Sequence, residues 1–285
     1  MPTYAVTGAT GPFGRHAVEE LLRRGTAPTD VVALVRDTAK AADLASRGVV
    51  VRPFDYDRPE TLAPALAGVD ALLFVSGSAV GQRERQHGAV VEAARAAGVG
   101  RIAYTSVLRA DTTDLPVAPE HVATERLLAA SGIPTTLLRN GWYTENYLGL
   151  LGQAEATGSI SSATRGAAVS PATRADLAAA AVSALLDERT AGRTVELGGP
   201  SFTMDELAAA FSRALGREVA HREVSPEELA TGLRAAGLDE GTAGFLVAVD
   251  VATAGGALEV GTADLEELLG RPATSLDDAL RAARA

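Results

Sequence analysis

A glycine-rich turn lies between the first strand pattern and the first helix pattern of the chain. It reads Thr-Gly-Ala-Thr-Gly-Pro-Phe-Gly and places Gly8, Gly11 and Gly14 three residues apart. Such a turn lets the backbone reverse tightly, approach a pyrophosphate closely and pack the helix against the strand. The following helix offers free N–H groups and the positive end of its dipole to phosphates. The turn predicts a dinucleotide-binding βαβ unit; a glycine-rich turn that binds nothing is the alternative.

Short apolar runs alternate with helical patterns over most of the chain. Strands are expected at 3–7, 31–35, 49–54, 71–76, 101–105, 135–139 and 194–197. Helices are expected from Phe13 to a cap at Gly25 and at 59–67, 83–97, 119–131 and 174–186, the last with Thr173 as its N-cap. This alternation is typical of an α/β fold with a parallel sheet covered on both faces. We therefore predict a doubly wound sheet of the Rossmann type.

The rhythm of the sequence changes after about residue 198. Helices are expected at 204–215, 226–236 and 262–269, with one strand at 218–224 and a glycine- and alanine-rich stretch at 253–261. This part lacks a strand series of its own. We expect a mainly NADP-binding domain over about 1–198 and a smaller C-terminal α+β lobe over 199–285 that covers the substrate.

Composition excludes several classes of site. The chain of 285 residues has no cysteine, which excludes disulfides, thiolate metal sites and a cysteine nucleophile. Its four histidines show no paired metal-ligand spacing, so no metal is expected. A net charge of −10 argues against nucleic acid as a partner. Without an apolar run near ~18 residues or a signal sequence, we expect a cytoplasmic protein that does not enter a membrane. A homodimer stays open.

The end of the second predicted strand indicates which dinucleotide binds. An NAD site usually has an acidic residue about 20 residues after the glycines, on the ribose 2′-hydroxyl. Here the strand ends in Arg36, followed by Asp37, and Lys40 lies one helical turn further on. A guanidinium forms bidentate contacts with phosphate oxygens, so Arg36 favours the 2′-phosphate of NADPH. In the alternative, Arg36 is a solvated residue and Asp37 binds the hydroxyl.

The carboxyl ends of the other strands are expected to line the ligand crevice. Ser76-Gly77-Ser78 follows the fourth strand, Thr105-Ser106 the fifth, and Arg139-Asn140-Gly141-Trp142-Tyr143 the sixth. The last of these runs is expected to curve around the nicotinamide. Asp55 follows the third strand, where it either reaches the adenine or forms a turn.

A motif common among reductases of this fold is absent. Tyr-x-x-x-Lys, which donates the proton on the helix after the fifth strand, occurs nowhere in the sequence; that helix has His121-Val-Ala-Thr-Glu125 instead. Hydride transfer to a ketone produces a strongly basic alkoxide, which requires a positioned acid. Transfer to a quinone produces a delocalised, less basic anion that hydrogen-bond donors can stabilise. The absence favours a quinone-like acceptor, or no catalysis.

Several stretches resemble a known family. VTGATGPFG, VVALVRD, VSGSAVGQR and RNGWYTENY are similar to the NmrA-like branch of atypical short-chain dehydrogenases/reductases. Within this branch the chain resembles the bacterial NADPH:quinone oxidoreductase type 2 proteins, which are related to the triphenylmethane reductases. The resemblance covers most of residues 1–185 and is looser beyond. It implies a flavin-free enzyme that passes hydride from NADPH to quinones.

The resemblance also implies site residues. Cofactor contacts are implied at Gly8, Ala9, Thr10, Gly11, Pro12, Phe13, Arg36, Ser76, Gly77, Ser78, Arg139, Asn140, Gly141, Trp142, Tyr143, Thr144 and Arg174. Gln82, Tyr143 and Asn146 match positions near the nicotinamide, where they would hold a quinone oxygen. His121 would do the same or supply a proton. An ordinary packing or surface role is the alternative for these four residues, and helix capping is the alternative for Arg174.

Gly77 departs from the quinone-reductase pattern, which often has Ser there, and the run FVSG also suits the triphenylmethane reductases. Two alternatives therefore stand beside quinone reduction. One is a reductase of dyes or other conjugated electrophiles. The other is a regulatory protein that senses NADP(H) without turnover, because the absent Tyr–Lys pair is compatible with such a role.

Overall fold

A seven-stranded parallel sheet forms the larger part of the protein. The structure is a computed structural model that describes residues 1–284. The strand order is β3-β2-β1-β4-β5-β6-β8, and every neighbouring pair is parallel. The strands are β1 (Tyr4–Thr7), β2 (Val31–Val35), β3 (Val50–Pro53), β4 (Ala71–Phe74), β5 (Arg101–Val107), β6 (Thr135–Asn140) and β8 (Thr194–Leu197). The order reverses between β1 and β4, which confirms the doubly wound fold.

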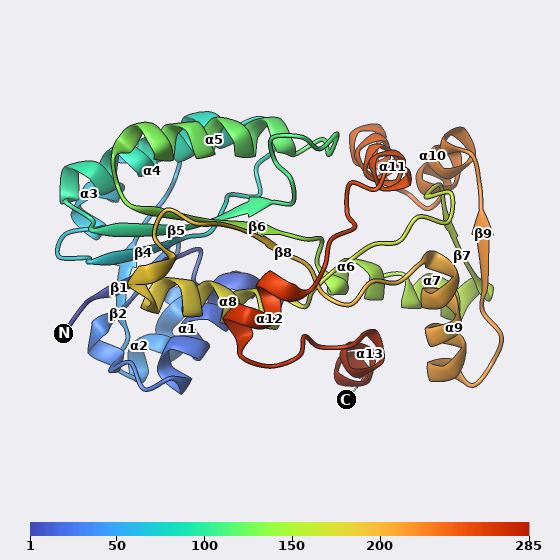
Figure 1. The fold of residues 1–285 in the computed structure, drawn as a ribbon, viewed down its shortest axis with the longest axis horizontal. Coiled ribbons are helices and arrows are strands. Elements are labelled where there is room, and N and C mark those ends of the chain that lie inside the picture. Colours follow the sequence, from blue (N-terminus) through green and yellow to red (C-terminus); the bar gives the residue numbers. More distant parts are fainter. Residues whose placement is uncertain (285) are drawn as a thin grey trace.

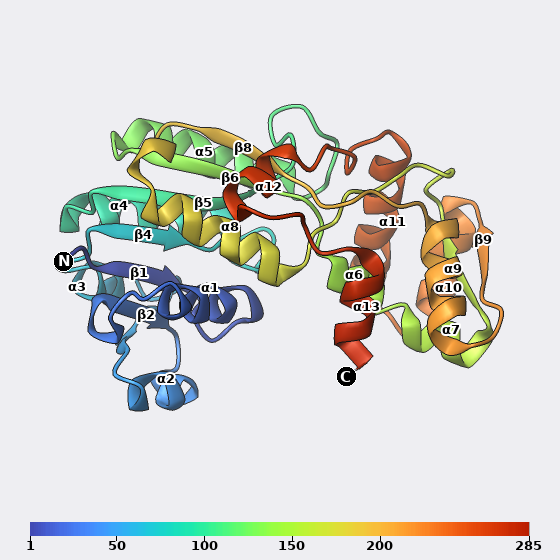
Figure 2. The same cartoon turned by 60° about the horizontal axis from the view of Figure 1, so that its bottom comes forward.

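Helices cover both faces of this sheet (Figure 1, Figure 2). One face packs against α1 (Pro12–Arg23), α2 (Ala42–Ser46) and α8 (Arg174–Leu186), with α12 (Ala263–Leu269) against α8. The opposite face packs against α3 (Leu62–Ala65), α4 (Arg83–Ala97) and α5 (Ala118–Ser131), and we name it the α4–α5 face. Short 3₁₀ turns precede or follow these elements: η1 (Pro28–Asp30), η2 (Thr38–Ala41), η3 (Pro59–Thr61) and η4 (Glu188–Thr190). All five residues of β2 are buried, as expected for a strand between two helical layers.

Local signals determine where these helices begin and end. Thr173 caps α8 as predicted, because its hydroxyl accepts the backbone N–H of Asp176 at 3.1 Å. Gly25 follows α1 with a φ of 89°, a conformation that favours glycine and ends the helix. The predicted ranges 83–97 and 174–186 match α4 and α8. Other predicted ends differ from the structure by a few residues. For example, β3 was expected at 49–54 and covers Val50–Pro53.

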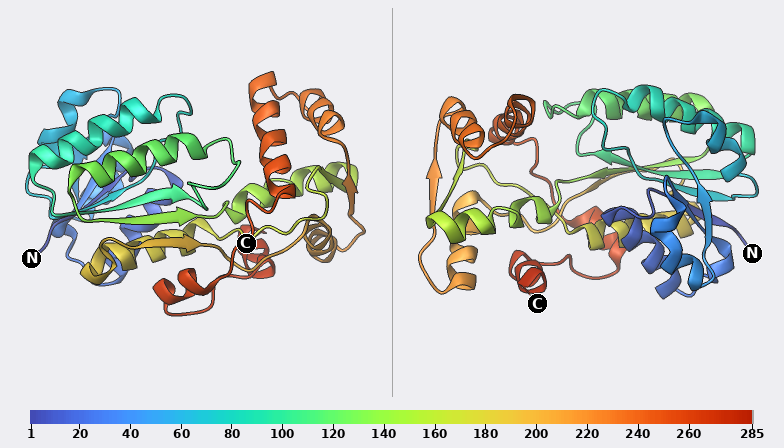
Figure 3. Two further views of the ribbon diagram at one scale, coloured as in Figure 1. Left: turned by 45° about the horizontal axis from the view of Figure 1, so that its top comes forward. Right: turned by 180° about the vertical axis from the view of Figure 1, so that it is seen from behind.

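A second region lies beyond the carboxyl ends of β6 and β8 (Figure 3). It has a two-stranded parallel sheet of β7 (Ser159–Ser162) and β9 (Ala220–Glu223). Around it lie α6 (Thr144–Leu148), α7 (Leu151–Thr157), α9 (Met204–Leu215), α10 (Pro226–Ala235), α11 (Glu240–Ala254) and α13 (Leu276–Arg284). All of these helices except α10 contribute to an apolar core that includes Phe202, Leu207 and Phe211, and α10 packs against α11. The predicted helices 204–215 and 226–236 correspond to α9 and α10.

The sequence prediction omitted the strand β7 and the helices α2, α6, α7, α11 and α13. The β7 run Ser-Ile-Ser-Ser has almost no apolar signal, and it becomes a strand because β9 pairs with it. Helix α11 contains Gly241 and Gly244, which disfavour helix, and its apolar residues lie all around the axis. Neither β7 nor α11 has a pattern of its own that would reveal it.

The second region takes chain from both sides of residue 198. Strand β7 comes before this residue and its partner β9 after it, whereas α12 returns to pack against α8 of the large sheet. The division into 1–198 and 199–285 stays a prediction about domains. None of the helices formed by residues 1–284 is long and apolar enough to cross a membrane.

Candidate functional site

The glycine turn joins β1 to α1 in a form that leaves little room for side chains. Gly8 has a φ of 60°, and its carbonyl oxygen accepts the backbone N–H of Gly11 at 2.8 Å. A Cβ on Gly14 would overlap with the Gly8 carbonyl, so the third glycine is required for the helix to approach the strand. No side chain caps the start of α1. Its first N–H groups are therefore available to an anion such as a pyrophosphate.

Arg36 and Asp37 at the end of β2 differ in what they contact. The Asp37 carboxylate accepts the backbone N–H of Ala39 at 3.0 Å and so caps the turn η2. The Arg36 side chain is exposed and makes no hydrogen bond or ion pair with any residue in 1–284. Of the two alternatives from the sequence, the guanidinium is free for a phosphate, whereas the carboxylate already has a structural partner.

The loop after β4 begins with Ser76, Gly77 and Ser78. The N–H of Ser76 donates to Oγ1 of Thr105 at 2.8 Å, which joins the carboxyl ends of β4 and β5. Ser76 and Gly77 are half-buried and Ser78 is exposed. Asp55, after β3, forms a turn by accepting the N–H of Asp57 at 3.1 Å, which is the second of the two roles considered for it.

The carboxyl end of β6 carries a buried amide without partners. Asn140 is 5% exposed, and neither its Oδ1 nor its Nδ2 has a hydrogen-bond partner within residues 1–284. Burying an unpaired polar group costs about 1–3 kcal/mol. A ligand that offers both a donor and an acceptor, as a carboxamide does, would satisfy this side chain. At the next residue, a Cβ on Gly141 would lie 2.9 Å from the carbonyl oxygen of Ser170, so only glycine fits well there.

The run after Gly141 connects the two regions. Trp142 stacks on Phe245 of α11, with ring centroids 6.4 Å apart. Tyr143 contacts the large sheet region instead: its ring centroid lies 6.3 Å from that of Phe13 in the glycine turn. Thr144 is buried, and its N–H donates to the Ala172 carbonyl at 3.0 Å. These contacts bring the sixth-strand run and the glycine turn together, as the sequence predicted for a common ligand crevice.

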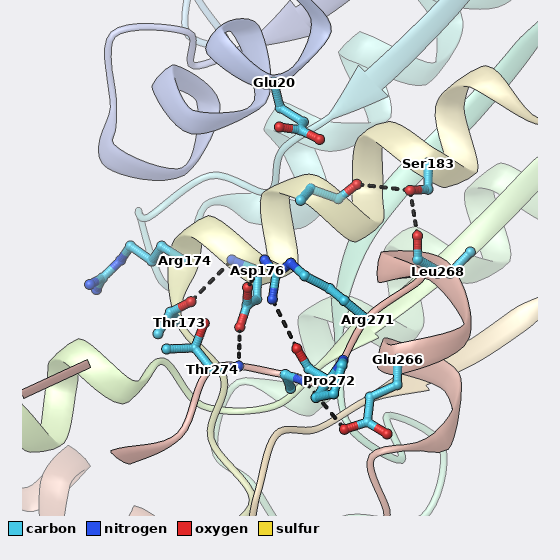
Figure 4. Close-up of polar contacts among 12 residues, drawn as sticks. Glu20, Thr173, Arg174, Asp176, Ser183, Glu266, Leu268, Arg271, Pro272 and Thr274 are labelled. Atoms are coloured by element: carbon cyan, nitrogen blue, oxygen red, sulfur yellow. Dashed lines mark hydrogen bonds and ion pairs between the residues drawn. The ribbon is translucent and has the colours of Figure 1, made fainter. Parts of the chain in front are cut away.

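Four side chains form a polar cluster between the starts of α6 and α8, which we name the α6–α8 edge. The guanidinium carbon of Arg174 lies 4.3 Å from the centre of the Tyr143 ring. Arg174 also donates to Oδ1 of Asn146 at 3.1 Å and pairs with Glu145 at 3.4 Å. Figure 4 shows Arg174 at the start of α8, directed away from the contacts of Asp176 with Arg271 and Thr274. Burial raises the pKa of Tyr143, against the effect of Arg174, so its hydroxyl stays a donor at neutral pH.

No hydrogen bond or ion pair within residues 1–284 joins His121 or Gln82 to this cluster. His121 is buried on the α4–α5 face, and its Nδ1 is 2.9 Å from the hydroxyl of Tyr104. Burial, helped by the charge of Arg83, lowers the pKa of His121 from its ordinary 6.5 to about 3. A ring that is neutral at physiological pH is a weak proton donor. Gln82 is exposed just before α4, and its Oε1 accepts Nη2 of Arg85 at 3.2 Å.

Arg139 is the centre of a buried ion-pair cluster. Glu125 binds its guanidinium at 2.8 Å and 3.0 Å, Asp111 at 2.8 Å and Glu196 at 3.2 Å. Glu125 also accepts the hydroxyl of Ser106 at 2.6 Å. These partners raise the pKa of Arg139 above its already high value. The helix face that carries Tyr-x-x-x-Lys in many reductases is thus occupied by Glu125 in a structural role. The sequence analysis did not predict this pairing, and the only local sign was the carboxylate four residues after His121.

No group of three or more histidine, cysteine, aspartate or glutamate side chains within the described chain is arranged to hold a metal ion. Three groups of the described chain have no partner within it: the first N–H groups of α1, the Arg36 guanidinium and the Asn140 amide. They fit a dinucleotide that carries phosphates and a carboxamide.

The chain is similar to proteins that bind nicotinamide dinucleotides. Residues 8–188 match a family described as NAD(P)H-binding. The quinone oxidoreductase 2 of Escherichia coli is 43% identical over 277 residues, which cover 97% of this chain and 96% of that protein. A crystal structure of the NADPH-dependent quinone oxidoreductase QOR2 from E. coli, complexed with NADPH, superposes with a TM-score of 0.96 at 41% identity and covers 99% of this chain and 100% of the other.

Two further similarities extend this comparison. The triphenylmethane reductase of Citrobacter sp., solved with NADP(H), superposes with a TM-score of 0.94 at 38% identity, covering 99% of this chain and all of the other. An NmrA-like family domain-containing oxidoreductase of Aspergillus flavus is 33% identical over 98% of this chain and 94% of its own length. The family resemblance that the sequence motifs indicated is therefore confirmed.

Proposed function

The chain belongs to the NAD(P)H-binding family, and we propose that it is an NADPH-dependent, flavin-free oxidoreductase that transfers hydride to a quinone. The observation that carries this proposal is the contrast between an uncapped glycine turn near a free Arg36 and an α4–α5 face whose polar side chains already have structural partners. The α4–α5 face holds His121 as a buried neutral ring and Glu125 as the partner of Arg139. An acceptor whose reduced form is a delocalised anion is compatible with that arrangement.

The proposed cofactor contacts follow the geometry of the turn and strand ends. NADPH, when bound, supplies the hydride. The turn from Gly8 to Phe13, including Ala9, Thr10, Gly11 and Pro12, would surround the pyrophosphate. The N–H groups of Thr10 and Phe13 would be its donors, because proline has no N–H and those of Ala9 and Gly11 donate to the carbonyls of Leu34 and Gly8. Arg36 would pair with the 2′-phosphate. The loop Ser76–Ser78, the run Asn140–Thr144 and Arg174 would line the nicotinamide half, with the Asn140 amide satisfying a carboxamide. The guanidinium of Arg139 is not offered to a ligand, because three carboxylates bind it, and its backbone pairs with β5 and β8 in the sheet.

The α6–α8 edge is the proposed position of the quinone oxygen. The Tyr143 hydroxyl, the Asn146 amide and the Arg174 guanidinium are donors that stabilise negative charge as it develops on that oxygen. We also propose that the protein is located in the cytoplasm.

A turnover assay tests the proposed activity. Purified wild-type protein without added flavin is expected to oxidise NADPH rapidly when a small benzoquinone or naphthoquinone is added, followed by the loss of NADPH absorbance. Inactivity with every quinone, in a protein that binds NADPH tightly, would contradict the enzyme proposal. If NADP⁺ and NADPH then bind with comparable affinity and a partner protein is recovered, the regulatory alternative applies.

One observation favours a second acceptor class. Gly77 stands where the quinone-reductase pattern often has Ser, and the chain is 38% identical to a triphenylmethane reductase. The ratio of kcat/KM for a triphenylmethane dye to that for a quinone separates the two acceptors. A ratio above one would assign the dye, or another conjugated cation, as the better substrate.

Substitution of Arg36 tests the choice of NADPH over NADH. Losing a charge-assisted bidentate contact should raise the KM for NADPH by about tenfold or more and leave the KM for NADH unchanged. Arg58→Ala is a matched control, because Arg58 is also an exposed arginine of this half of the sheet and pairs only with Glu60. An unchanged ratio of NADPH to NADH efficiency in Arg36→Ala would exclude Arg36 from the cofactor site.

A further inference from the structure

Two buried side chains of α4 bind the backbone of Gly77. The Nε2 atom of His87 accepts the Gly77 N–H at 3.0 Å, and Nε of Arg83 donates to the Gly77 carbonyl at 2.6 Å. His87 has no exposed surface and Arg83 is 8% exposed. Both backbone groups of one glycine, in a loop at the carboxyl end of β4, are thus bound by buried side chains.

The hydrogen bonds around His87 determine its tautomer. Because Nε2 accepts from Gly77, the proton of the neutral ring is on Nδ1, which lies 2.9 Å from Oγ1 of Thr124. The Thr124 hydroxyl in turn donates to the carbonyl of Glu120 at 2.9 Å. Burial, with the charge of Arg83, lowers the pKa of His87 to about 3. The ring therefore stays neutral and keeps its acceptor toward Gly77 at physiological pH.

Glu120 of α5 holds the other end of the same loop. Its Oε1 accepts the N–H groups of Gly81 at 2.8 Å and of Arg83 at 3.1 Å, and its Oε2 lies 3.4 Å from Nη1 of Arg83. This carboxylate takes the place of an N-cap side chain, because Gln82 makes no capping bond to α4. The segment from Gly77 to Arg83 is fixed at both ends by groups from α4 and α5.

The residues of this loop would not by themselves hold it in one conformation. Gly77 has the widest choice of backbone angles of any residue type, and Ser78, Val80 and Gln82 are exposed. Contacts that bind both peptide groups of Gly77 remove that freedom before a ligand arrives, which lowers the entropy lost on binding.

We propose that His87 and Arg83 are positioning residues for NADPH, because they hold the Ser76–Ser78 backbone in the conformation that the nicotinamide half of the cofactor requires. This inference rests on the proposed function for the identity of the ligand. It assigns a role to a histidine that contacts neither cofactor nor acceptor and that transfers no proton.

Two variants of the intact chain test the inference by NADPH titration. His87→Phe keeps a ring of similar size and removes the acceptor, and we expect the Kd for NADPH to rise about tenfold. Arg83→Lys keeps the charge but cannot place Nε at Gly77, and we expect a similar rise. With saturating NADPH, kcat should change less than KM. His87→Gln, which restores an acceptor, should recover part of the affinity. Arg95→Ala is the control on the same helix, since Arg95 is exposed and pairs only with Glu92.

A spectroscopic measurement on the wild-type chain decides the case even where a variant fails to fold. The ¹⁵N chemical shifts of His87 should report an unprotonated Nε2 and a protonated Nδ1 from about pH 5 to about pH 8. A protonated Nε2 would overturn the inference. So would lowered unfolding stability of His87→Phe and Arg83→Lys with an unchanged Kd. A wild-type chain that binds NADPH but reduces no acceptor would overturn the proposed function instead and leave this inference standing.

Discussion

The α4–α5 face and the α6–α8 edge contain the same kinds of polar groups, but these groups differ in how many partners they have within the chain. Each has an arginine bound to carboxylates and an aromatic hydroxyl. On the α4–α5 face the arginine is Arg139, whose side chain is 10% exposed and bound by three carboxylates. At the edge it is Arg174, whose side chain is 23% exposed and pairs with Glu145 alone. The first set is satisfied within the chain, whereas the second leaves donors for a ligand.

Residue type alone does not identify a functional site in this molecule. His121 and Ser106 are residues that serve acid catalysis elsewhere, yet here they bind Tyr104 and Glu125. Asn140 is of an ordinary turn-forming type, yet both polar atoms of its buried side chain have no hydrogen-bond partner within residues 1–284. If the comparison is correct, changes on the α4–α5 face alter stability first, and changes at the edge alter catalysis or binding first.

The largest effect is expected from breaking the buried ion pair on the α4–α5 face. Glu125→Ala leaves Arg139 buried without its bidentate partner and should lower the free energy of unfolding by about 3 kcal/mol, measured by urea denaturation. Removing both charges, as in the double variant Glu125→Leu with Arg139→Met, should recover most of this loss. A fall in kcat with unchanged stability would instead place Glu125 in catalysis rather than in a structural ion pair.

Acid should destabilise the α4–α5 face through its buried histidines. The pKa of His121 is lowered from 6.5 to about 3 in the folded state, so the unfolded chain binds a proton first as the pH falls. Stability is fully present above about pH 6.5 and declines toward pH 3. Between pH 7 and pH 5 each such histidine accounts for about 2 kcal/mol. His121→Asn should reduce the acid loss by that amount, and an equal loss in both proteins would disprove the assignment.

Removing the arginine of the α6–α8 edge should affect turnover rather than folding. Arg174→Ala is expected to lower kcat/KM for a quinone about twentyfold, or roughly 1.8 kcal/mol of transition-state stabilisation. The unfolding free energy should change by less than about 1 kcal/mol, because partly exposed ion pairs contribute little. Arg193→Ala, which removes the exposed pair with Glu267, is the control and should leave both quantities unchanged.

The smallest effect is expected at Asn140, where a substitution should raise stability instead of lowering it. Asn140→Leu removes an unpaired buried amide and should raise the stability of the protein without cofactor by about 1 kcal/mol. The same change should reduce the thermal shift that NADPH induces. Parallel melting curves with and without NADPH measure both. A variant that is destabilised and still binds NADPH fully would show that Asn140 has only a packing role.

The parts that the sequence predicted correctly depend on short-range signals. Thr173 caps α8 through a residue three positions away, and Gly8 and Gly14 shape a turn that is contained in one motif. The strands of the large sheet are apolar runs that can be recognised one at a time. Helix α11 and strand β7 were missed because neither has such a signal, and β7 exists only through its pairing with β9.

From residues that are neighbours in the chain, the sequence predicted the dinucleotide turn, the parallel sheet and an arginine suited to a 2′-phosphate. Which polar groups stay free depends instead on long-range contacts that form in the folded chain. The partners of Arg139 lie 14, 28 and 57 positions away, and those of Gly77 come from a helix whose inward face no local pattern reveals. The hydrogen-bond partner of a buried polar group can come from any part of the chain. The donors that stay free at the α6–α8 edge can therefore be identified only from the folded structure.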